Sequence, residues 1–466
     1  MNKITGELGF DNAKHLLRRL WSGDLRDIDA FSKLTTDQAF QIIFEDLGFS
    51  MSSETEGGRE IFASDFWVKK HKGQTPYVLG RQASFLFSMF PAKLSEAHTL
   101  DYVAWYGFLD YYALGSFKEA VKNMLLQNNM IRRLPNANEN EGDEPNENVG
   151  RELLELFTLG KGKQLSKDEY ERYTQDDVNA ISRILSGYHY NTGLDKHPAG
   201  WQIGIGAWGF IEGPKQLSDR FGSVVIDGTQ EQQLDQLIEA IFNHPDMGKL
   251  VIEKLIRWYA NDDEVVNEAV RDHLIQVFKD ADWHFEPVLR ELFSLEWFYQ
   301  DENKGSRIMS PMDMFFHVLS YYSASYDPSQ WLLDDRDTRL SIMGETWFDP
   351  KGGIAGNYAD YQPPHFSQYW ILSPDQLQAR YDFFSEMVLE NGPAILMPFV
   401  DGLSFDEAAT KLAKYVFAGE LIEDELIPLK AEALGNASVS HWDTEKEVIL
   451  TRLLEKFYRS PQAQLH

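Results

Sequence analysis

The stretch Pro145–Gly160, with the sequence PNENVGRELLELFTLG, is the clearest helix of the chain. Its apolar residues recur at helical spacing and make one face apolar: Val149, Leu153, Leu156 and Phe157. Asn146 or Asn148 can accept hydrogen bonds from the free N–H groups of the first turn. Gly160 stands where a helix commonly ends in a left-handed residue. The stretch therefore predicts a capped amphipathic helix, and it indicates a mainly helical fold.

Helical periodicity also marks most of the chain on either side of this stretch. The further segments that favour helix are 11–48, 97–127 with a break at Gly115-Ser116, 174–188, 230–260 with a break at His244-Pro245, 264–300, 311–323, 376–390, 404–416 and 443–459. Three irregular segments separate them: an acidic loop over 136–148 and two excursions rich in Gly, Pro and aromatic residues over 197–229 and 344–375. We expect one large helical domain over residues 1–466, with long ordered loop excursions and short strands.

The chain is strongly acidic. Asp and Glu number 73 against 44 Lys and Arg, which gives a formal net charge of −29. Such a surface repels the phosphates of nucleic acids and of anionic membranes, so neither is expected as a partner. The same charge also fits simple solubility or adaptation to salt.

The sequence contains no cysteine. Disulfides, thiolate zinc sites and cysteine nucleophiles are therefore excluded. No stretch approaches the ~18 consecutive apolar residues of a membrane helix, and the first residues contain no apolar leader segment. We expect a soluble chain without membrane insertion, either cytoplasmic as written or exported with its leader removed.

Familiar catalytic motifs are missing from the sequence. It has no GxxxxGK[ST] phosphate loop, no HExxH zinc motif and no GxSxG nucleophile motif. The sequence therefore gives little reason to expect a P-loop enzyme, a zinc peptidase or a serine hydrolase.

Glu152 is the first candidate catalytic residue. A helical wheel over residues 149–157 puts Glu152 at the edge of the apolar stripe and Glu155 further out. A carboxyl group half-buried at such an edge has a raised pKa and suits general acid or base work, or metal ligation. The alternative is a structural ion pair, with Arg18 or Arg151 as the partner.

Asp177, Arg18 and His15 complete the candidate catalytic set. Asp177 also fits a structural role, because Thr174 and Asp177 form a capping box with Asp in place of Glu. His15 lies beside an apolar and basic segment, where a hydrogen-bonded core histidine is an equally simple interpretation. A catalytic role requires one pocket that joins Glu152, Asp177, Arg18 and His15.

The acidic loop is a candidate calcium site. Asn138, Asn140, Asp143 and Glu147 offer the hard oxygen ligands of which calcium takes about six to eight. Gly142 falls one place too late for the EF-hand pattern. The alternative is a solvated acidic turn before the helix. Calcium is the one cofactor that the sequence suggests.

Eight segments, collinear from about residue 11 to 466, together resemble a bacterial family known as domain of unknown function 1800. They are HLLRRLWSG, LGSFKEAVKNMLLQNNMIRRL, PNENVGRELLELFTLG, YTQDDVNAISRILSGY, IFNHPDMGKLVIEKLIRWYAND, SRIMSPMDMFFHVLSYY, YADYQPPHFSQYWILSPDQLQ and LLEKFYRSPQAQLH. The resemblance implies a largely helical fold and a bacterial source, and it supplies no established catalytic assignment. Members commonly carry an export leader and are often encoded beside a sulfatase-like protein of another uncharacterised family, which implies a candidate partner.

The chain departs from the family pattern in three places. It lacks the leader, and it has Tyr106 where many relatives have a His after the Trp. It offers Ile211-Glu212 where an HD-like pair would precede the turn that ends in Lys215. A family metal site built on those histidines would be incomplete here.

Two functions from different classes follow. The first is an accessory or binding protein that works with an exported or surface partner. The second is a carboxylate- or metal-dependent hydrolase that acts on a glycan or ester. A deep pocket around the candidate carboxylates favours the enzyme, and an apolar or aromatic face favours the binding protein.

Overall fold

The computed structural model describes residues 1–21, 25–45, 77–90, 99–133, 145–167, 169–189, 205–206, 209–261, 266–321, 342–343, 373–419, 423–435 and 437–466. In this part of the chain the fold is mainly helical, as the sequence predicts. The only sheets within it are three two-stranded antiparallel pairs: β1–β2, β3–β4 and β5–β6.

The elements follow in chain order. Up to residue 189 they are α1 (Gly9–Arg19), α2 (Leu25–Phe31), α3 (Thr36–Ile43), α5 (Tyr77–Met89), α6 (Thr99–Tyr112), α7 (Phe117–Leu125), α8 (Asn128–Arg133), α9 (Asn148–Glu152), the π-helix η2 (Leu153–Thr158), β1 (Gln164–Ser166), β2 (Glu169–Tyr170), α10 (Gln175–Ile184) and β3 (Tyr188–His189). From residue 205 on they are β4 (Ile205–Gly206), β5 (Lys215–Gln216), β6 (Val225–Ile226), α11 (Gln230–Phe242), α12 (Lys249–Tyr259), α13 (Glu268–Asp280), α14 (Phe285–Ser294), α15 (Pro311–Tyr321), α17 (Pro374–Leu396), α18 (Phe405–Val416), α19 (Glu423–Leu434) and α20 (Lys446–Tyr458). Short 3₁₀ turns lie between several of them, among them η5 (Asp301–Asn303) and η8 (Met397–Phe399).

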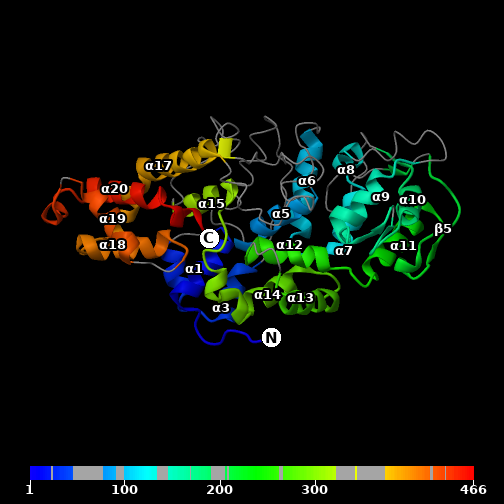
Figure 1. Cartoon of the computed structure of the whole chain (residues 1–466), viewed down its shortest axis with the longest axis horizontal. Coiled ribbons are helices and arrows are strands. Elements are labelled where there is room, and N and C mark those ends of the chain that lie inside the picture. The colour runs from blue at the N-terminus through cyan, green and yellow to red at the C-terminus, as the bar shows by residue number, and fades with distance from the viewer. Residues whose placement is uncertain are drawn as a thin grey trace.

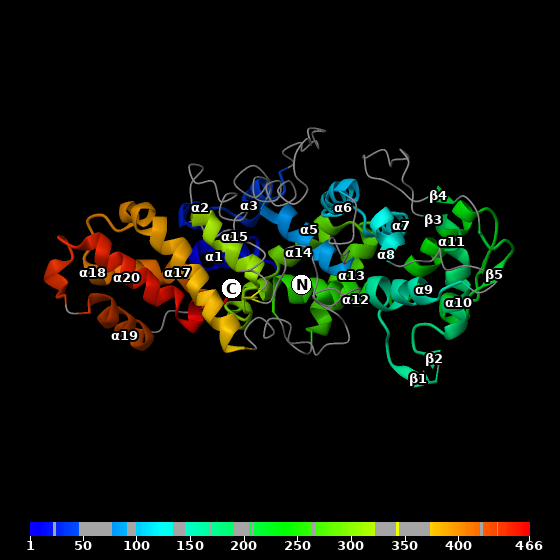
Figure 2. The same cartoon turned by 90° about the horizontal axis from the view of Figure 1, so that it is seen from above.

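The molecule is elongated, and its chain ends lie near the middle (Figure 1). Helices α18, α19 and α20 form one end, and α10, α11 and β5 form the other (Figure 2). One connected cluster of buried apolar side chains nevertheless runs from Leu8 to Ala463. This continuity is what a single helical domain over 1–466 requires, although that boundary stays a prediction. No helix in the described ranges is both long and apolar enough to cross a bilayer.

Most predicted helices and breaks are confirmed. The break before residue 117 is real, since the Ser116 hydroxyl accepts a hydrogen bond from Glu119 N at 3.4 Å and caps α7. The break at His244 separates α11 from α12. The short strands expected within 197–229 are present as β4, β5 and β6. Most of the second excursion, residues 344–372, lies outside the described residues.

Several elements differ from the expectation, among them α19, α5 and the end of α10. Helix α19 was missed in the sequence because Pro428, which normally interrupts a helix, lies inside it. Helix α5 was missed because aromatic and turn residues obscure its period. The helix expected over 174–188 stops at Ile184, and Gly187, with φ +83°, turns the chain into β3.

Helix α1 is joined to the C-terminal end of the fold by two buried cations. Lys14 Nζ donates to the carbonyls of Lys414 and Phe417, each at 3.0 Å. Arg18 Nη1 donates to the carbonyls of Tyr415 at 3.3 Å and Val416 at 2.9 Å. The last carbonyls of a helix have no partner within it, and the negative end of the helix dipole attracts cations. The two side chains therefore cap α18 and fix it to α1.

Three buried arginines donate hydrogen bonds to the C-terminal end of α12. Arg19 Nη2 donates to the carbonyl of Ala260, the C-terminal cap of α12, at 2.6 Å. Arg81 and Arg307 both donate to the carbonyl of Trp258 in the last turn of the same helix. All three arginines are at most 2% exposed. Segments from three other parts of the chain thus converge on the C-terminal end of α12.

Asp313 is the carboxylate of this interior cluster. It forms an ion pair with Arg81 and accepts a hydrogen bond from Trp21 Nε1 at 2.6 Å. Its other oxygen accepts from Ser310 N at 2.9 Å, which begins α15. Because Asp313 and Arg81 are 2% and 1% exposed, water can replace neither partner.

We therefore expect Asp313→Asn to destabilise the fold strongly. The change leaves the Arg81 charge buried beside a neutral amide, and breaking a buried pair in this way costs about 3–5 kcal/mol. Equilibrium denaturation in guanidinium chloride measures the loss. The control is Glu432→Gln, since Glu432 is 58% exposed and pairs with Lys456 at 3.0 Å on the surface, where a pair contributes about 0–1 kcal/mol. Equal losses in the two variants would contradict the expectation.

Candidate functional site

The helix that the sequence marks most clearly changes type in its middle. It is α-helical only over α9, and η2 continues it as a π-helix. Leu159 N donates to the carbonyl of Leu154 at 3.0 Å, five residues back, and the Thr158 hydroxyl donates to the carbonyl of Leu153 at 2.6 Å. As predicted, Asn146 Oδ1 accepts from Asn148 N at 2.9 Å. The expectation of an α-helix up to Gly160 was wrong, and π turns are often found at functional sites.

The π turn reverses the predicted order of the two glutamates. Glu155 is the buried carboxylate, 2% exposed, and Glu152 is half-buried. The wheel assumed the α-helical period throughout, and the wider turn rotates residue 155 inward. Arg151 Nη1 lies 3.7 Å from Glu155 Oε1, so this ion pair has its acidic partner in the interior.

Glu155 accepts a hydrogen bond from the hydroxyl of Tyr173. Burial first, and then this bond, raise the pKa of Tyr173. A tyrosine held by a carboxylate in this way stays protonated and donates, so the pair ties η2 to the segment before α10.

Asp177 serves as a cap in the structure. It completes the predicted capping box, with Thr174 N donating to Asp177 Oδ2 at 2.8 Å. Its carboxylate also accepts from Ser218 N and from the Ser218 hydroxyl, each at 2.7 Å. The carboxylate accepts a fourth hydrogen bond from the Thr174 hydroxyl at 2.8 Å. Asp177 is fully buried, and its bonds join α10 to the turn between β5 and β6.

Glu152 and Asp177 lie on helices α9 and α10, which pack against each other closely. A Cβ at Gly150 would lie 2.6 Å from Ser182 Oγ, so only glycine permits this approach. His15 and Arg18 lie on α1, in the middle of the molecule (Figure 1). The structure does not bring the four predicted catalytic residues into one pocket.

His15 and Arg18 have interior packing roles. The His15 ring lies against Phe298 and Tyr299, with centroids 4.7 and 6.1 Å away, while Arg18 caps α18. Burial first, and then Arg19, hold the pKa of His15 well below its usual value. His15 is therefore neutral at neutral pH.

The predicted calcium ligands are only partly described. Asn138, Asn140 and Asp143 lie outside the described residues. Glu147 contacts Arg151 Nη2 at 3.4 Å and accepts from the amide of Gln175. No group of three or more His, Asp or Glu side chains within the described ranges is placed to hold a metal ion. Calcium therefore stays a prediction.

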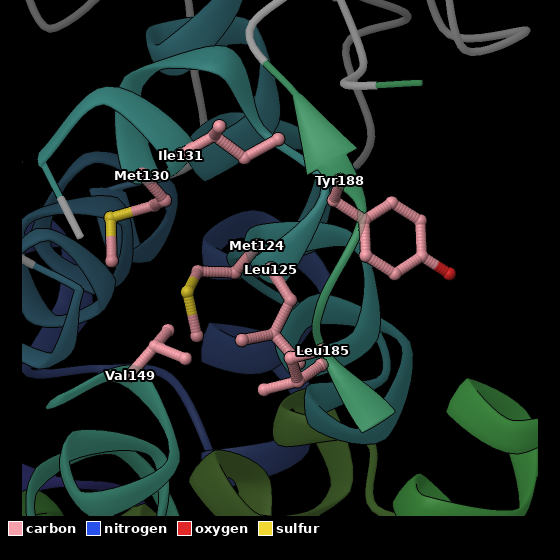
Figure 3. A pocket seen from close by; sticks show the side chains of 7 residues that line it. All are labelled: Met124, Leu125, Met130, Ile131, Val149, Leu185 and Tyr188. Atoms are coloured by element: carbon pink, nitrogen blue, oxygen red, sulfur yellow. The ribbon is translucent and has the colours of Figure 1, made fainter. Parts of the chain in front are cut away.

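An apolar pocket lies beside α9 and α10, and no sequence pattern predicts it. The cavity is small, about 20 Å³, so a partner's side chain enters it only when the surrounding side chains move apart. It is lined by Met124, Leu125, Met130, Ile131, Val149, Leu185 and Tyr188 (Figure 3). These residues come from α7, α8, α9, the end of α10 and β3. The sequence of a single element does not predict such a pocket, because its lining residues come from several elements that are brought together only in the tertiary structure.

Acidic side chains lie near the hydroxyl of Tyr188, on the outer side of the pocket wall. The hydroxyl of Tyr188 points away from the cavity (Figure 3). Burial raises the pKa of Tyr188, and the charges of Glu231 and Asp235 on α11 raise it further. Asp235 also pairs with Lys122 at 2.6 Å. The cavity is therefore apolar inside, and the acidic groups lie behind Tyr188, where Lys122 pairs with one of them.

A double-mutant cycle tests the link between Glu155 and Tyr173. We expect Glu155→Ala and Tyr173→Phe to show a coupling energy of about 1.5–3 kcal/mol, because a buried hydroxyl that loses a charged acceptor is left unsatisfied. Urea denaturation of the wild type, both single variants and the double variant gives this energy. A coupling near zero would mean that the bond adds nothing to the stability of η2.

Acid should destabilise the protein through its buried histidines. The folded pKa values of His15, His317 and His466 are all well below 6.5, so the unfolded chain binds more protons below that pH. Stability is thus fully present above pH ~6.5 and falls as the pH falls, by about 1.4 kcal/mol per histidine at pH ~5.5.

We expect His15→Phe, which keeps an aromatic ring against Phe298, to reduce this loss by one histidine's share. Denaturation curves at pH ~7.5 and ~5.5 provide the comparison. An unchanged pH dependence in the variant would contradict the assignment of a neutral His15.

Comparison with known proteins gives one match. Residues 27–465 match the family model described as "Protein of unknown function (DUF1800)". No curated protein and no solved structure matches the chain. The family match covers almost the whole sequence and agrees with the segments that resemble domain of unknown function 1800. The chain belongs to the DUF1800 family.

Proposed function

We propose that the protein binds a partner protein by receiving an apolar side chain in the pocket between α7, α8, α9 and β3. The composition of the pocket carries the proposal. Six of its seven lining residues are aliphatic or thioether side chains, and the seventh is Tyr188. This lining offers no acid or base for chemical conversion, and it suits an apolar anchor that is buried on binding. Met124 and Met130 add adaptability, because thioether side chains adjust their shape readily.

The acidic groups behind Tyr188 and the net charge of the chain favour a partner with basic residues around its apolar anchor. Glu231 and Asp235 lie close enough to Tyr188 to affect its pKa. The whole chain has a net charge of −29, which attracts a basic surface over a longer range. Charge of this kind accelerates association and orients the partner, while the apolar anchor supplies most of the affinity.

The sulfatase-like neighbour implied by the family resemblance is the partner to test. It would place the protein beside exported or surface material as an accessory protein. The pocket supports a binding role in general, and the choice of this partner rests on the resemblance alone.

The hydrolase acting on a glycan or ester stays a second candidate. The observation that favours it is the buried Glu155 on a π turn, with Arg151 at 3.7 Å. Asp177 is already committed to four donors in the helix cap. A hydrolase would therefore rely on Glu152 and Glu155 and not on the predicted pair Glu152 and Asp177.

The pocket hypothesis is tested by filling the pocket. Val149→Met fills the small cavity with a side chain of the kind that already lines it, so we expect the protein to stay folded with at most a modest loss of melting temperature. We also expect binding to the purified sulfatase-like protein to weaken about tenfold, which is about 1.4 kcal/mol. Biolayer interferometry measures the affinity, and thermal denaturation measures the fold.

The matched control is Val448→Met. Val448 is 49% exposed on α20, at the opposite end of the molecule. It should bind like the wild type. Equal affinities of Val149→Met and the wild type would rule out the pocket as the anchor site, and the absence of any complex with the wild-type chain would rule out this partner.

A further inference from the structure

The junction between β6 and α11 contains the dipeptide Asp227–Gly228. Both residues are exposed, and Thr229 follows as the N-terminal cap of α11. The peptide nitrogen of Gly228 donates a hydrogen bond to Asp227 Oδ1 at 2.8 Å. Since Oδ1 is one covalent bond from Cγ, the nitrogen lies beside the side-chain carbon that it would have to attack to close a five-membered ring. Reaction becomes favourable when such atoms are held about 3–3.5 Å apart.

Gly228 leaves this nitrogen open to reaction. Its φ is +117°, a conformation that L side chains rarely adopt. A Cβ at this position would lie 2.6 Å from Gln232 Oε1. Gly228 therefore places no side chain of its own over the peptide bond after Asp227, and the local backbone accepts only glycine.

The backbone of Asp227 is held on both sides by one side chain. Asp227 N donates to Gln236 Oε1 at 3.2 Å, and Gln236 Nε2 donates to the carbonyl of Asp227 at 2.7 Å. Gln236 belongs to α11, so the folded helix restricts the rotation that would otherwise separate the carboxyl group from the next nitrogen. The fold thus lowers the entropy cost of ring closure.

We propose that Asp227–Gly228 is a site of aspartate isomerisation through a succinimide. A bond forms between Gly228 N and Asp227 Cγ, the bond between Cγ and the carboxyl hydroxyl breaks, and the amide proton leaves with that hydroxyl as one water molecule. One water then adds to either ring carbonyl and opens the ring to aspartate or to isoaspartate. Nothing is oxidised or reduced, and the final mass equals the initial mass. Isoaspartate adds a methylene to the main chain between β6 and α11.

The chain provides an internal control with the same dipeptide. Asp401–Gly402 is also exposed, lies between η8 and α18, and has a positive φ of +71° at its glycine. In the described structure, Gly402 N makes no hydrogen bond to the carboxylate of Asp401. The two sites share their chemistry and exposure, so a difference in rate reports the geometry at Asp227.

The experiment compares the two sites in the folded full-length chain. Purified protein is incubated at mildly acidic pH in heavy-oxygen water, digested, and analysed by mass spectrometry with electron-transfer fragmentation. We expect isoaspartate and one incorporated heavy oxygen to appear several-fold faster at Asp227 than at Asp401. In urea the two rates should become similar, because the hydrogen bonds that hold Asp227 are lost.

The variant Gln236→Ala tests the role of the backbone contacts. We expect it to slow isomerisation at Asp227 several-fold and to leave Asp401 unchanged, with thermal denaturation as the check of folding. Equal rates at the two sites in the folded wild type would overturn the proposal. A wild-type rate at Asp227 in Gln236→Ala would overturn the part assigned to Gln236.

Discussion

The fold depends on buried cations that bind the carbonyl ends of helices. Lys14 and Arg18 on α1 cap α18, about 400 residues away in sequence, and Arg19 reaches the end of α12. Burial lowers the pKa of Lys14 to about 8. This shift reflects the cost of removing the ammonium group from water, which the contacts at the end of α18 must offset. The carbonyls and the helix dipole supply that compensation. Without these contacts the N-terminal, central and C-terminal helices would lose their shared interior.

This interior explains why residues with catalytic appearance have structural roles. The paired arginines of the HLLRRL segment point in two directions, with Arg18 toward α18 and Arg19 toward α12. Asp177 is satisfied by backbone and hydroxyl donors from two segments. Buried polar groups of this kind must form hydrogen bonds within the protein, and these structural bonds occupy their donors and acceptors. The pocket, by contrast, is built of side chains that need no partner.

The π-helix η2 directly follows α9, the helix that lines one side of that pocket. Val149 lines the cavity from α9, and η2 follows within a few residues. Gly150 permits the close contact with α10, and the π turn then places Glu155 against Tyr173. The stretch Pro145–Gly160 therefore contributes one wall of the pocket and the buried hydrogen bond between Glu155 and Tyr173. This arrangement gives a structural reason for the sequence of the segment while the partner remains a proposal.

The sequence by itself determined the helical class, most helix boundaries, the capping box at Thr174 and the left-handed Gly160, because caps, periods and turns depend on neighbours within a few residues. The helical wheel placed Glu152 at a half-buried edge, as observed, but it placed Glu155 further out, and the structure buries Glu155. Only the tertiary structure decided the π turn, the burial of Glu155, the separation of His15 from Asp177 and the pocket. Each of these depends on contacts between segments far apart in the chain, such as Glu155 with Tyr173 or Arg18 with Val416, and local periodicity carries no information about such contacts.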